Sequence, residues 1–253
     1  MRVGARLLAV QDDAFAAVWI EPAGRLEPWL LRGDGVRLGK PLKPDFEAAL
    51  AHDGVAWLLG SGSLPQRCAV ARLDLARGRA EVQARPGWYA AIAEVLGAAP
   101  NIEGAARHGG ALWLTHRGAG TSASALLRMA PGALEHAVPA IESCTRCDLG
   151  SLDGVPLHFT DAAAGPSALW FLAAAECTPD AIADGPVTGS VLGRIESDGA
   201  RWVPVLEADG QRSRAKFEGL VVEEGGASAW LLSDPDDAAA AARLCRVRLR
   251  GFG

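Results

Sequence analysis

Short apolar stretches alternate with turns along nearly the whole chain. A typical stretch is Trp57-Leu58-Leu59, which follows the turn His52-Asp53-Gly54 and ends at Gly60-Ser61. Brief apolar runs bounded by Gly, Asp and Ser are typical of β-strands joined by tight reversals. One stretch, Trp88 to Leu96, has the spacing of an amphipathic helix. The pattern therefore predicts an all-β fold with at most one helix.

Three markers recur in the same order in four parts of the chain. An acidic residue is followed by a turn, then by an apolar stretch with a Trp, then by a second apolar stretch with an Arg. The acidic residues are Glu47, Glu103, Asp161 and Glu218, at intervals of 56, 58 and 57 residues; the tryptophans are Trp57, Trp113, Trp170 and Trp230; the arginines are Arg72, Arg128, Arg194 and Arg246. Such a period indicates a repeat architecture.

The N-terminal region reads as a fifth, shorter copy. Trp19 takes the place of the marker tryptophan, Arg32 that of the arginine, and the first strand would run from about Gly4 to Val10, without a carboxylate. The units are approximately 1–43, 44–99, 100–157, 158–214 and 215–253. We predict a single domain, a five-bladed β-propeller of four-stranded antiparallel blades, with six blades as the second choice. The last unit ends soon after its third strand, so its outer strand is either missing or supplied by the first residues.

Each acidic marker stands at the start of the innermost strand of its blade. Successive strands of a blade are antiparallel, so the innermost strand begins at the end of the channel where the second strand finishes. We therefore expect Glu47, Glu103, Asp161 and Glu218 to converge on the axis at one end. Polar loops leave the second strands at that same end; they contain Ser61, Ser63 and Arg67, then His116 and Arg117, then Glu176 through Asp180 to Ser190, and then Ser233 to Asp237.

Two interpretations of the four carboxylates remain open. A hard cation with oxygen ligands would balance their charge, Ca²⁺ being the first choice and Mg²⁺ the second. Alternatively, each carboxylate accepts hydrogen bonds from the next blade and is purely structural. Nothing in the sequence indicates an organic cofactor.

The polar loops supply candidates for binding and catalysis. His116 and Glu176 are candidate general bases. The candidates for binding a small anionic molecule are Arg67, Arg117, Ser61, Ser63, Asp180, Asp234 and Lys216. The first hypothesis is a metal-dependent hydrolase of a phosphorylated or other anionic small molecule. The second is a non-enzymatic propeller that binds a ligand or a protein, since propellers serve both roles.

Composition narrows the classes of function. A formal charge of −5 argues against a nucleic-acid binder, and no run of residues is long and apolar enough for a membrane span. The start of the chain lacks a secretory pattern and the number of cysteines is odd, which favours a reducing, cytoplasmic location and a monomer without disulfides. Cys144 and Cys147 have the spacing of a metal or redox pair, but no second pair accompanies them, and we interpret them as small residues of an outer strand.

Several stretches resemble known propeller proteins. Lys43-Pro44-Asp45-Phe46-Glu47, Gly60-Ser61-Gly62-Ser63, Asn101-Ile102-Glu103-Gly104-Ala105-Ala106, Thr160-Asp161-Ala162-Ala163 and Ala174-Ala175-Glu176-Cys177-Thr178-Pro179-Asp180 carry the likeness. They resemble bacterial phytase-like and esterase-like propellers, and more closely an uncharacterised bacterial family among them, which implies the fold and leaves the activity open.

A more distant resemblance is to the soluble calcium-activated nucleotidases (apyrases). It rests on the five-blade count and on Glu at the start of innermost strands. It implies an axial calcium ion held by Glu47, Glu103 and Glu218, with Asp161 as a substitute carboxylate, and hydrolysis of nucleoside diphosphates at the same face. Arg67 and Arg117 would then hold phosphate. The first unit departs from this pattern because it has no carboxylate near Ala5 to Leu7.

Overall fold

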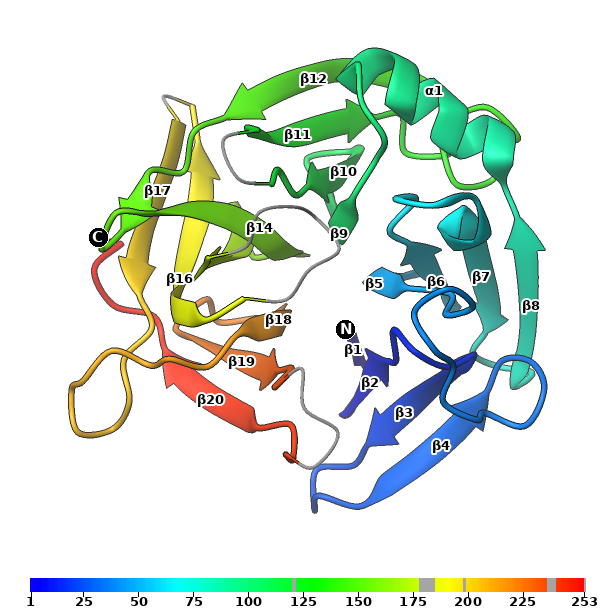
Figure 1. The fold of residues 1–253 in the computed structure, drawn as a ribbon. Helices are drawn as coiled ribbons and strands as arrows, with labels where there is room; N and C mark the ends of the chain where they lie inside the picture. Colours follow the sequence, from blue (N-terminus) through cyan, green and yellow to red (C-terminus); the bar gives the residue numbers. More distant parts are fainter. Residues whose placement is uncertain (120–121, 178–184, 198, 236–239, 253) are drawn as a thin grey trace.

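The computed structural model describes residues 1–119, 122–177, 185–197, 199–235 and 240–252. In these residues five small antiparallel sheets surround a central channel as the blades of a propeller (Figure 1). The predicted fold class and blade count are confirmed. Four of the five sheets each lie within one predicted unit, whereas the fourth sheet begins at Ser151, before the predicted boundary at 158. No helix among the described residues is long and apolar enough to cross a membrane.

The blades follow one another along the chain. Blade 1 contains β1 (Arg2–Val3), β2 (Arg6–Val10), β3 (Ala16–Ile20) and β4 (Leu26–Leu30); blade 2 contains β5 (Phe46–His52), β6 (Val55–Gly60), β7 (Ala69–Asp74) and β8 (Arg79–Ala84); blade 3 contains β9 (Ile102–His108), β10 (Ala111–His116), β11 (Ser124–Met129) and β12 (Ile141–Cys147). Blade 4 contains β13 (Ser151–Leu152), β14 (Val155–Ala164), β15 (Leu169–Glu176), β16 (Val187–Glu196) and β17 (Gly199–Pro204); blade 5 contains β18 (Phe217–Val222), β19 (Ser228–Ser233) and β20 (Leu244–Arg248).

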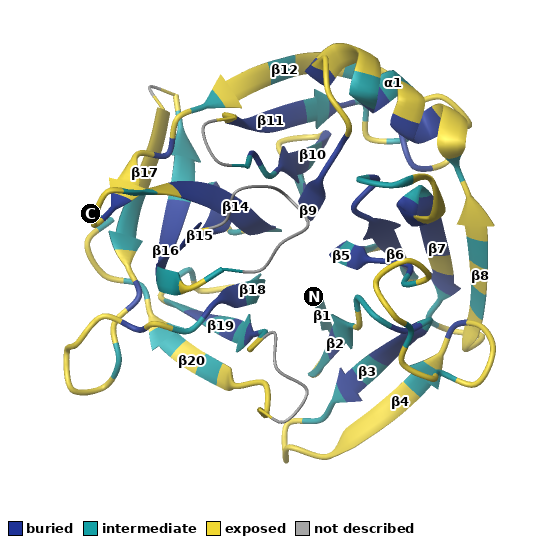
Figure 2. Ribbon diagram, viewed as in Figure 1, coloured by how far each residue is buried: buried dark blue, intermediate teal, exposed yellow. Residues whose placement is uncertain are grey.

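Burial decreases from the inner strands to the outer ones. Every residue of β15 is buried, whereas most of β4 and β8 is exposed, as Figure 2 shows. The apolar faces of neighbouring sheets pack on each other to form the core, as sheet packing requires. The closest approach is between β9 and β14: a Cβ on Gly104 would lie 2.3 Å from the backbone nitrogen of Ala162, so only glycine fits there.

The Trp and Arg markers of blades 2 to 5 follow the predicted order. Each marker tryptophan lies on the strand after the one that carries the acidic marker, directly opposite the marker arginine of the next strand; the pairs are Trp57 with Arg72, Trp113 with Arg128, Trp170 with Arg194 and Trp230 with Arg246. In blades 2 and 3 the guanidinium lies over the indole ring, at 5.9 Å from its centroid. The repeat therefore encodes a cross-strand pair.

Blade 1 corrects the sequence interpretation. The innermost strand is β1, not the whole stretch from Gly4 to Val10, and β2 is the second strand. The backbone N–H of Asp45, just before β5, donates to the carbonyl of Asp12, just after β2, so the end of β2 lies beside the start of β5. Trp19 therefore lies on a third strand, where it stacks on Trp29 and contacts the Arg6 guanidinium at 4.1 Å, and it does not correspond to the other tryptophans.

Blade 5 has three strands among the described residues. The first residues of the chain form β1 of blade 1 and do not supply a fourth strand to blade 5. Between these two blades, the Arg2 guanidinium lies 3.7 Å from the Glu223 carboxylate. Of the two alternatives for the last blade, a missing outer strand is the one the described residues show.

The helix lies where the sequence placed it. α1 (Pro86–Leu96) has Pro86 in its first turn and ends at Gly97, whose positive φ of 67° suits a helix C-terminus. It lies beside β12 at the junction of blades 2 and 3, where Trp88 and Tyr89 are fully buried. The short helix η1 (Pro65–Arg67) lies in the loop between β6 and β7.

Cys144 and Cys147 lie on β12, the outer strand of blade 3. Cys144 packs against the core between blades 2 and 3, whereas Cys147 packs toward blade 4. Side chains three positions apart on a strand point to opposite faces, so the two thiols do not converge. The interpretation as residues of an outer strand is confirmed.

Candidate functional site

A β-bulge positions the acidic markers. In blades 2, 3 and 5 the pairing of the first two strands skips one residue, and the skipped residue is the marker: Glu47, Glu103 or Glu218. A bulged residue is released from the ladder and its side chain is re-aimed. We call this end of the channel, with these three carboxylates, the acid end.

The same position in blade 4 is occupied by Thr160, not by Asp161. The pairing skips from Phe159 to Asp161, and the Thr160 hydroxyl donates to the carbonyl of Phe217 in blade 5 at 2.6 Å. Asp161 follows one residue later, and its carboxylate accepts the N–H groups of Ala162 at 2.7 Å and Leu220 at 2.6 Å. Asp161 is therefore held by backbone N–H groups, one of them from the next blade.

Burial raises the pKa of all four predicted carboxyl groups. The pKa of Glu47 is well above its ordinary range because of burial and because of the charges of Glu103, Asp45 and Glu218. Burial also raises the pKa of Glu103, that of Asp161 to about 8 and that of Glu218 to about 7. Removing carboxylates from water destabilises the ionised form, and mutual repulsion adds to this. Nearby cations offset part of the rise at Glu103, Asp161 and Glu218, whereas burial and the neighbouring carboxylates all raise the pKa of Glu47.

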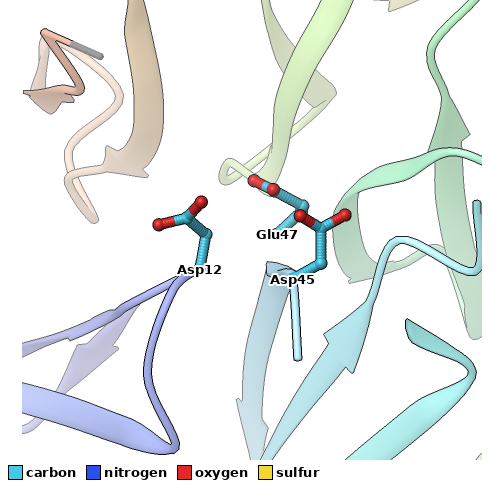
Figure 3. Close-up of side chains that lie close together, drawn as sticks. All are labelled: Asp12, Asp45 and Glu47. Carbon is cyan, nitrogen blue, oxygen red and sulfur yellow. The ribbon is translucent and has the colours of Figure 1, made fainter. Parts of the chain in front are cut away.

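Three of the four carboxylates have polar partners in the described protein, and one has none. Glu103 accepts a hydrogen bond from the side-chain amide of Asn101 at 2.9 Å, and Glu218 lies 2.9 Å from the Lys216 ammonium. Glu47 has no hydrogen bond or ion pair to any described residue. Its carboxylate lies within 4.8 Å of those of Asp12 and Asp45. Figure 3 shows these three side chains close together.

The Asp45 carboxylate pairs with two cationic side chains. Its carboxylate lies 2.7 Å from the Lys43 ammonium and 2.9 Å from the Arg67 guanidinium, and it accepts the Ser61 hydroxyl. Its backbone has a φ of 56°, a left-handed conformation that Asp tolerates better than most residues. The Lys43 ammonium also bonds to the Asp12 carboxylate. Burial lowers the pKa of Lys43, but the carboxylates of Asp12 and Asp45 raise it by more, so the net shift is upward.

The predicted binding arginines are engaged by the protein itself. Arg67 is buried; besides Asp45 it donates to the Ser63 hydroxyl at 2.9 Å. Arg117 pairs with Glu176 and lies 3.8 Å from Glu103. The polar loops thus meet at the acid end as predicted, but their cations neutralise carboxylates.

The predicted general bases are occupied as well. Nδ1 of His116 accepts the backbone N–H of Asn101 at 2.9 Å, and burial lowers the pKa of this histidine to about 4. Burial raises the pKa of Glu176, but Lys216, the Gly185 N–H and Arg117 lower it more, so the carboxylate is ionised and paired. Their proposed catalytic role stays a prediction that this geometry does not favour.

Two of the remaining candidates, Lys216 and Asp234, also lie at the acid end. Lys216 is buried and lies between Glu218 and Glu176, at 2.9 and 3.5 Å, and Asp234 lines the same cavity as Glu218. Asp180 lies outside the described residues.

The sequence analysis missed the contribution of the first blade. Asp12 and Asp13 follow β2 and lie at the acid end, because blade 1 begins with β1. Asp45 was also missed, although it stands two residues before Glu47 in the repeat. The sequence does carry a signal for this site, because Asp12 and Asp13 directly follow an apolar stretch. The sequence analysis takes that stretch as the innermost strand of blade 1, which places the loop after it at the opposite end of the channel.

The fold and the acid end define the class of protein: a five-bladed propeller with a carboxylate-rich site on its axis. Residues 1–249 match a family of unknown function, DUF6929. The chain belongs to this family, in agreement with the resemblance to an uncharacterised propeller family. No curated protein matches the chain.

Several solved structures are similar to this chain in the path of the backbone. The arabinanase of Bacillus subtilis is 12% identical to this chain with a TM-score of 0.49, and the match covers 99% of this chain and 92% of the arabinanase. A mutant α-L-arabinanase of Cellvibrio cellulosa is 13% identical with a TM-score of 0.49, covering 100% and 93%. A streptogramin B lyase is 12% identical with a TM-score of 0.38, covering 99% and 67%. None of these matches is a phytase or a nucleotidase.

Proposed function

We propose that this propeller is a hydrolase of small molecules that works at its acid end with a bound divalent cation, Ca²⁺ as first choice and Mg²⁺ as second. The observation that carries the proposal is Glu47: its carboxylate has no polar partner among the described residues, yet burial and four further carboxylates raise its pKa. A divalent cation supplies the missing positive charge, and carboxylate oxygens are the ligands such ions prefer.

Glu47 has acidic neighbours in two groups. The carboxylates of Asp12 and Asp45 lie within 4.8 Å of its own, but Lys43 already places its ammonium on both, so a cation between these two would have to displace it. The second group is Glu103 and Glu218, whose charges raise the pKa of Glu47. We therefore assign the ion to the ring of Glu47, Glu103 and Glu218, with Asp161 as a further candidate ligand.

A cation at this place would polarise an oxygen of the substrate and favour attack by water. Glu218 would hold the cation through its carboxylate, whose ionised form the bound ion would favour. An anionic substrate, a phosphate ester included, would be attracted by the cation itself, since Arg67 and Arg117 are paired with carboxylates.

A second candidate function is a non-enzymatic binding propeller. It is favoured by the engagement of His116 and Glu176, both of which are satisfied by the protein. In that case the acid end binds its ligand without turnover.

The test of the cation is thermal unfolding in EDTA, followed by addition of Ca²⁺ or Mg²⁺. A cation that binds only the folded state raises Tm by mass action. Glu47→Gln should abolish the rise, whereas Glu94→Gln, on the exposed face of α1, should leave it intact. Absence of any rise in the parent protein would overturn the cation site.

The test of the reaction is a screen of phosphate esters, nucleotides and short acyl esters with the metal-loaded protein. We expect hydrolysis that EDTA and Glu218→Gln suppress. A cation-dependent rise in Tm without any turnover would support the binding propeller instead.

A further inference from the structure

The junction of the last and first blades is hollow. The innermost strands of neighbouring blades are in contact from β5 through β9 and β14 to β18, whereas a cavity of about 290 Å³ lies between β2 and β18. We call it the seam cavity. Its cause is the length of β1: this strand covers only Arg2 and Val3, with Met1 bonded to Leu8, so no strand covers Ala9 and Val10 on the inner side of β2.

The walls of the seam cavity combine apolar and polar surface, and both blades contribute to the apolar part. Val10 and Ile20 contribute from blade 1, and Leu220, Val221, Trp230 and Leu232 contribute from blade 5. All but Leu220 are only partly buried. A cavity of this size that joins apolar walls to polar groups is typical of small-molecule sites.

Acidic groups outnumber basic groups among the described residues that line the seam cavity. Six of these residues carry a carboxyl group; they are Asp12, Asp13, Glu47, Asp161, Glu218 and Asp234. Two basic groups stand among them, the Met1 amino group and Arg37, and Arg37 is paired with Asp13, while Lys43 pairs with Asp12 and Lys216 with Glu218. The apolar part of the walls strengthens the remaining excess of negative charge and concentrates ions of the opposite sign.

We propose that the seam cavity binds a small organic cation: an apolar, preferably aromatic body between β2 and β18, and one ammonium group directed at Glu47 and Glu218. The apolar walls favour the body through burial, and the carboxylates favour the ammonium over an alcohol or a carboxylate. The site needs neither hydrolysis nor a metal, and so goes beyond the function proposed above.

The experiment compares four probes by isothermal titration calorimetry in EDTA and low salt. 2-Phenylethylamine has both features; 2-phenylethanol lacks the charge, 3-phenylpropanoate reverses it, and methylamine lacks the body. We expect the amine to bind at least about ten-fold more tightly than each of the others. Equal binding of the alcohol, or no binding of the amine, would overturn the proposal.

Two variants and a spectrum locate the ligand. Glu47→Gln should lower the affinity for the amine but not the affinity for the alcohol. Val10→Trp should fill the cavity and prevent binding of the amine. The control, Val95→Trp on the exposed surface of α1, should bind the amine as tightly as the parent. Methyl NMR of the parent should show shifts at Val10 and Val221 but not at Val95, even if Val10→Trp fails to fold. Binding with shifts elsewhere would refute the site. If the amine binds but Ca²⁺ leaves Tm unchanged, the cation site fails while this one stands.

Discussion

Two junctions of the propeller close in different ways. Between blades 2 and 3 the helix α1 fills the space: Trp88 is fully buried and its indole N–H donates to the carbonyl of Ala133 at 3.0 Å, and the Tyr89 hydroxyl lies 2.7 Å from the carbonyl of Gly60. Between blades 5 and 1 a cavity remains, because β1 is two residues long. The length of one innermost strand thus decides whether a junction is packed or hollow.

The difference also separates stability from function. The packed junction combines apolar burial with satisfied polar groups, which is the arrangement that stabilises a fold. The hollow junction exposes apolar walls and carboxylates with raised pKa values, which destabilise the folded state but provide a place to bind. The comparison predicts that substitutions at the two junctions differ sharply in their effects.

The largest effect is expected for Trp88→Ala. Loss of this fully buried side chain leaves a cavity under α1 and should lower the free energy of unfolding by about 3–5 kcal/mol. Urea unfolding measures it, with Val95→Ala on the exposed face of the same helix as the control. Equal losses for the two variants would show that α1 does not stabilise the packed junction.

Next is Arg67→Ala, beside the packed junction. The ion pair with Asp45 is buried, so removal of the guanidinium leaves a carboxylate poorly compensated, at a cost of about 3 kcal/mol. Arg25→Ala, which removes an exposed guanidinium, should hardly change the urea midpoint. A nearly neutral Arg67→Ala would mean that Lys43 alone suffices for Asp45.

A matched pair of small-to-large substitutions compares the junctions directly. Ala105→Val adds two methyl groups to the packed core and should cost about 1–3 kcal/mol. Ala9→Val adds them to the wall of the seam cavity and should change the free energy of unfolding by less than about 0.5 kcal/mol. If Ala9→Val costs as much as Ala105→Val, the cavity is not available space.

A pH dependence that comes from the acid end should be smaller than the effects of Trp88→Ala and Arg67→Ala. In the folded state the pKa of Asp161 is about 8 and that of Glu218 about 7, both above the unfolded values, so the folded protein binds more protons. Stability should therefore fall as pH rises through 7 and 8, by about 1 kcal/mol or more between pH 6.5 and 8.5. The Met1 amino group opposes this in part, because burial lowers its pKa in the folded state, whereas His116, with a pKa of about 4, is already neutral there.

Urea unfolding at both pH values tests this dependence. Glu218→Gln should reduce it, since the amide does not titrate. Unchanged stability of the parent across the range would show that the charges are balanced in solution, by a cation for example, and repeating the series in EDTA distinguishes that case.

The sequence by itself determined the propeller, its five blades and the approximate course of each. The acidic, Trp and Arg markers recur at fixed spacing, and the alternation of apolar and polar residues fixes which side of a strand is buried. The same regularity predicted the gathering of polar loops at one end, because this follows from strand direction within a repeat. The pairing of each marker tryptophan with a marker arginine, such as Trp57 with Arg72, was found only in the structure.

Only the tertiary structure decided the details on which chemistry depends. The bulge that positions Glu47 in blade 2 recurs in blade 4, but there the bulged residue is Thr160. In blade 1, β2 is the second strand, and this brings Asp12 to the acid end. Arg67 and Arg117 are taken up by carboxylates of distant segments. These outcomes arise from contacts between blades and from a one-residue change of register. Neither changes the local pattern of apolar and polar residues, so the sequence pattern could not predict them.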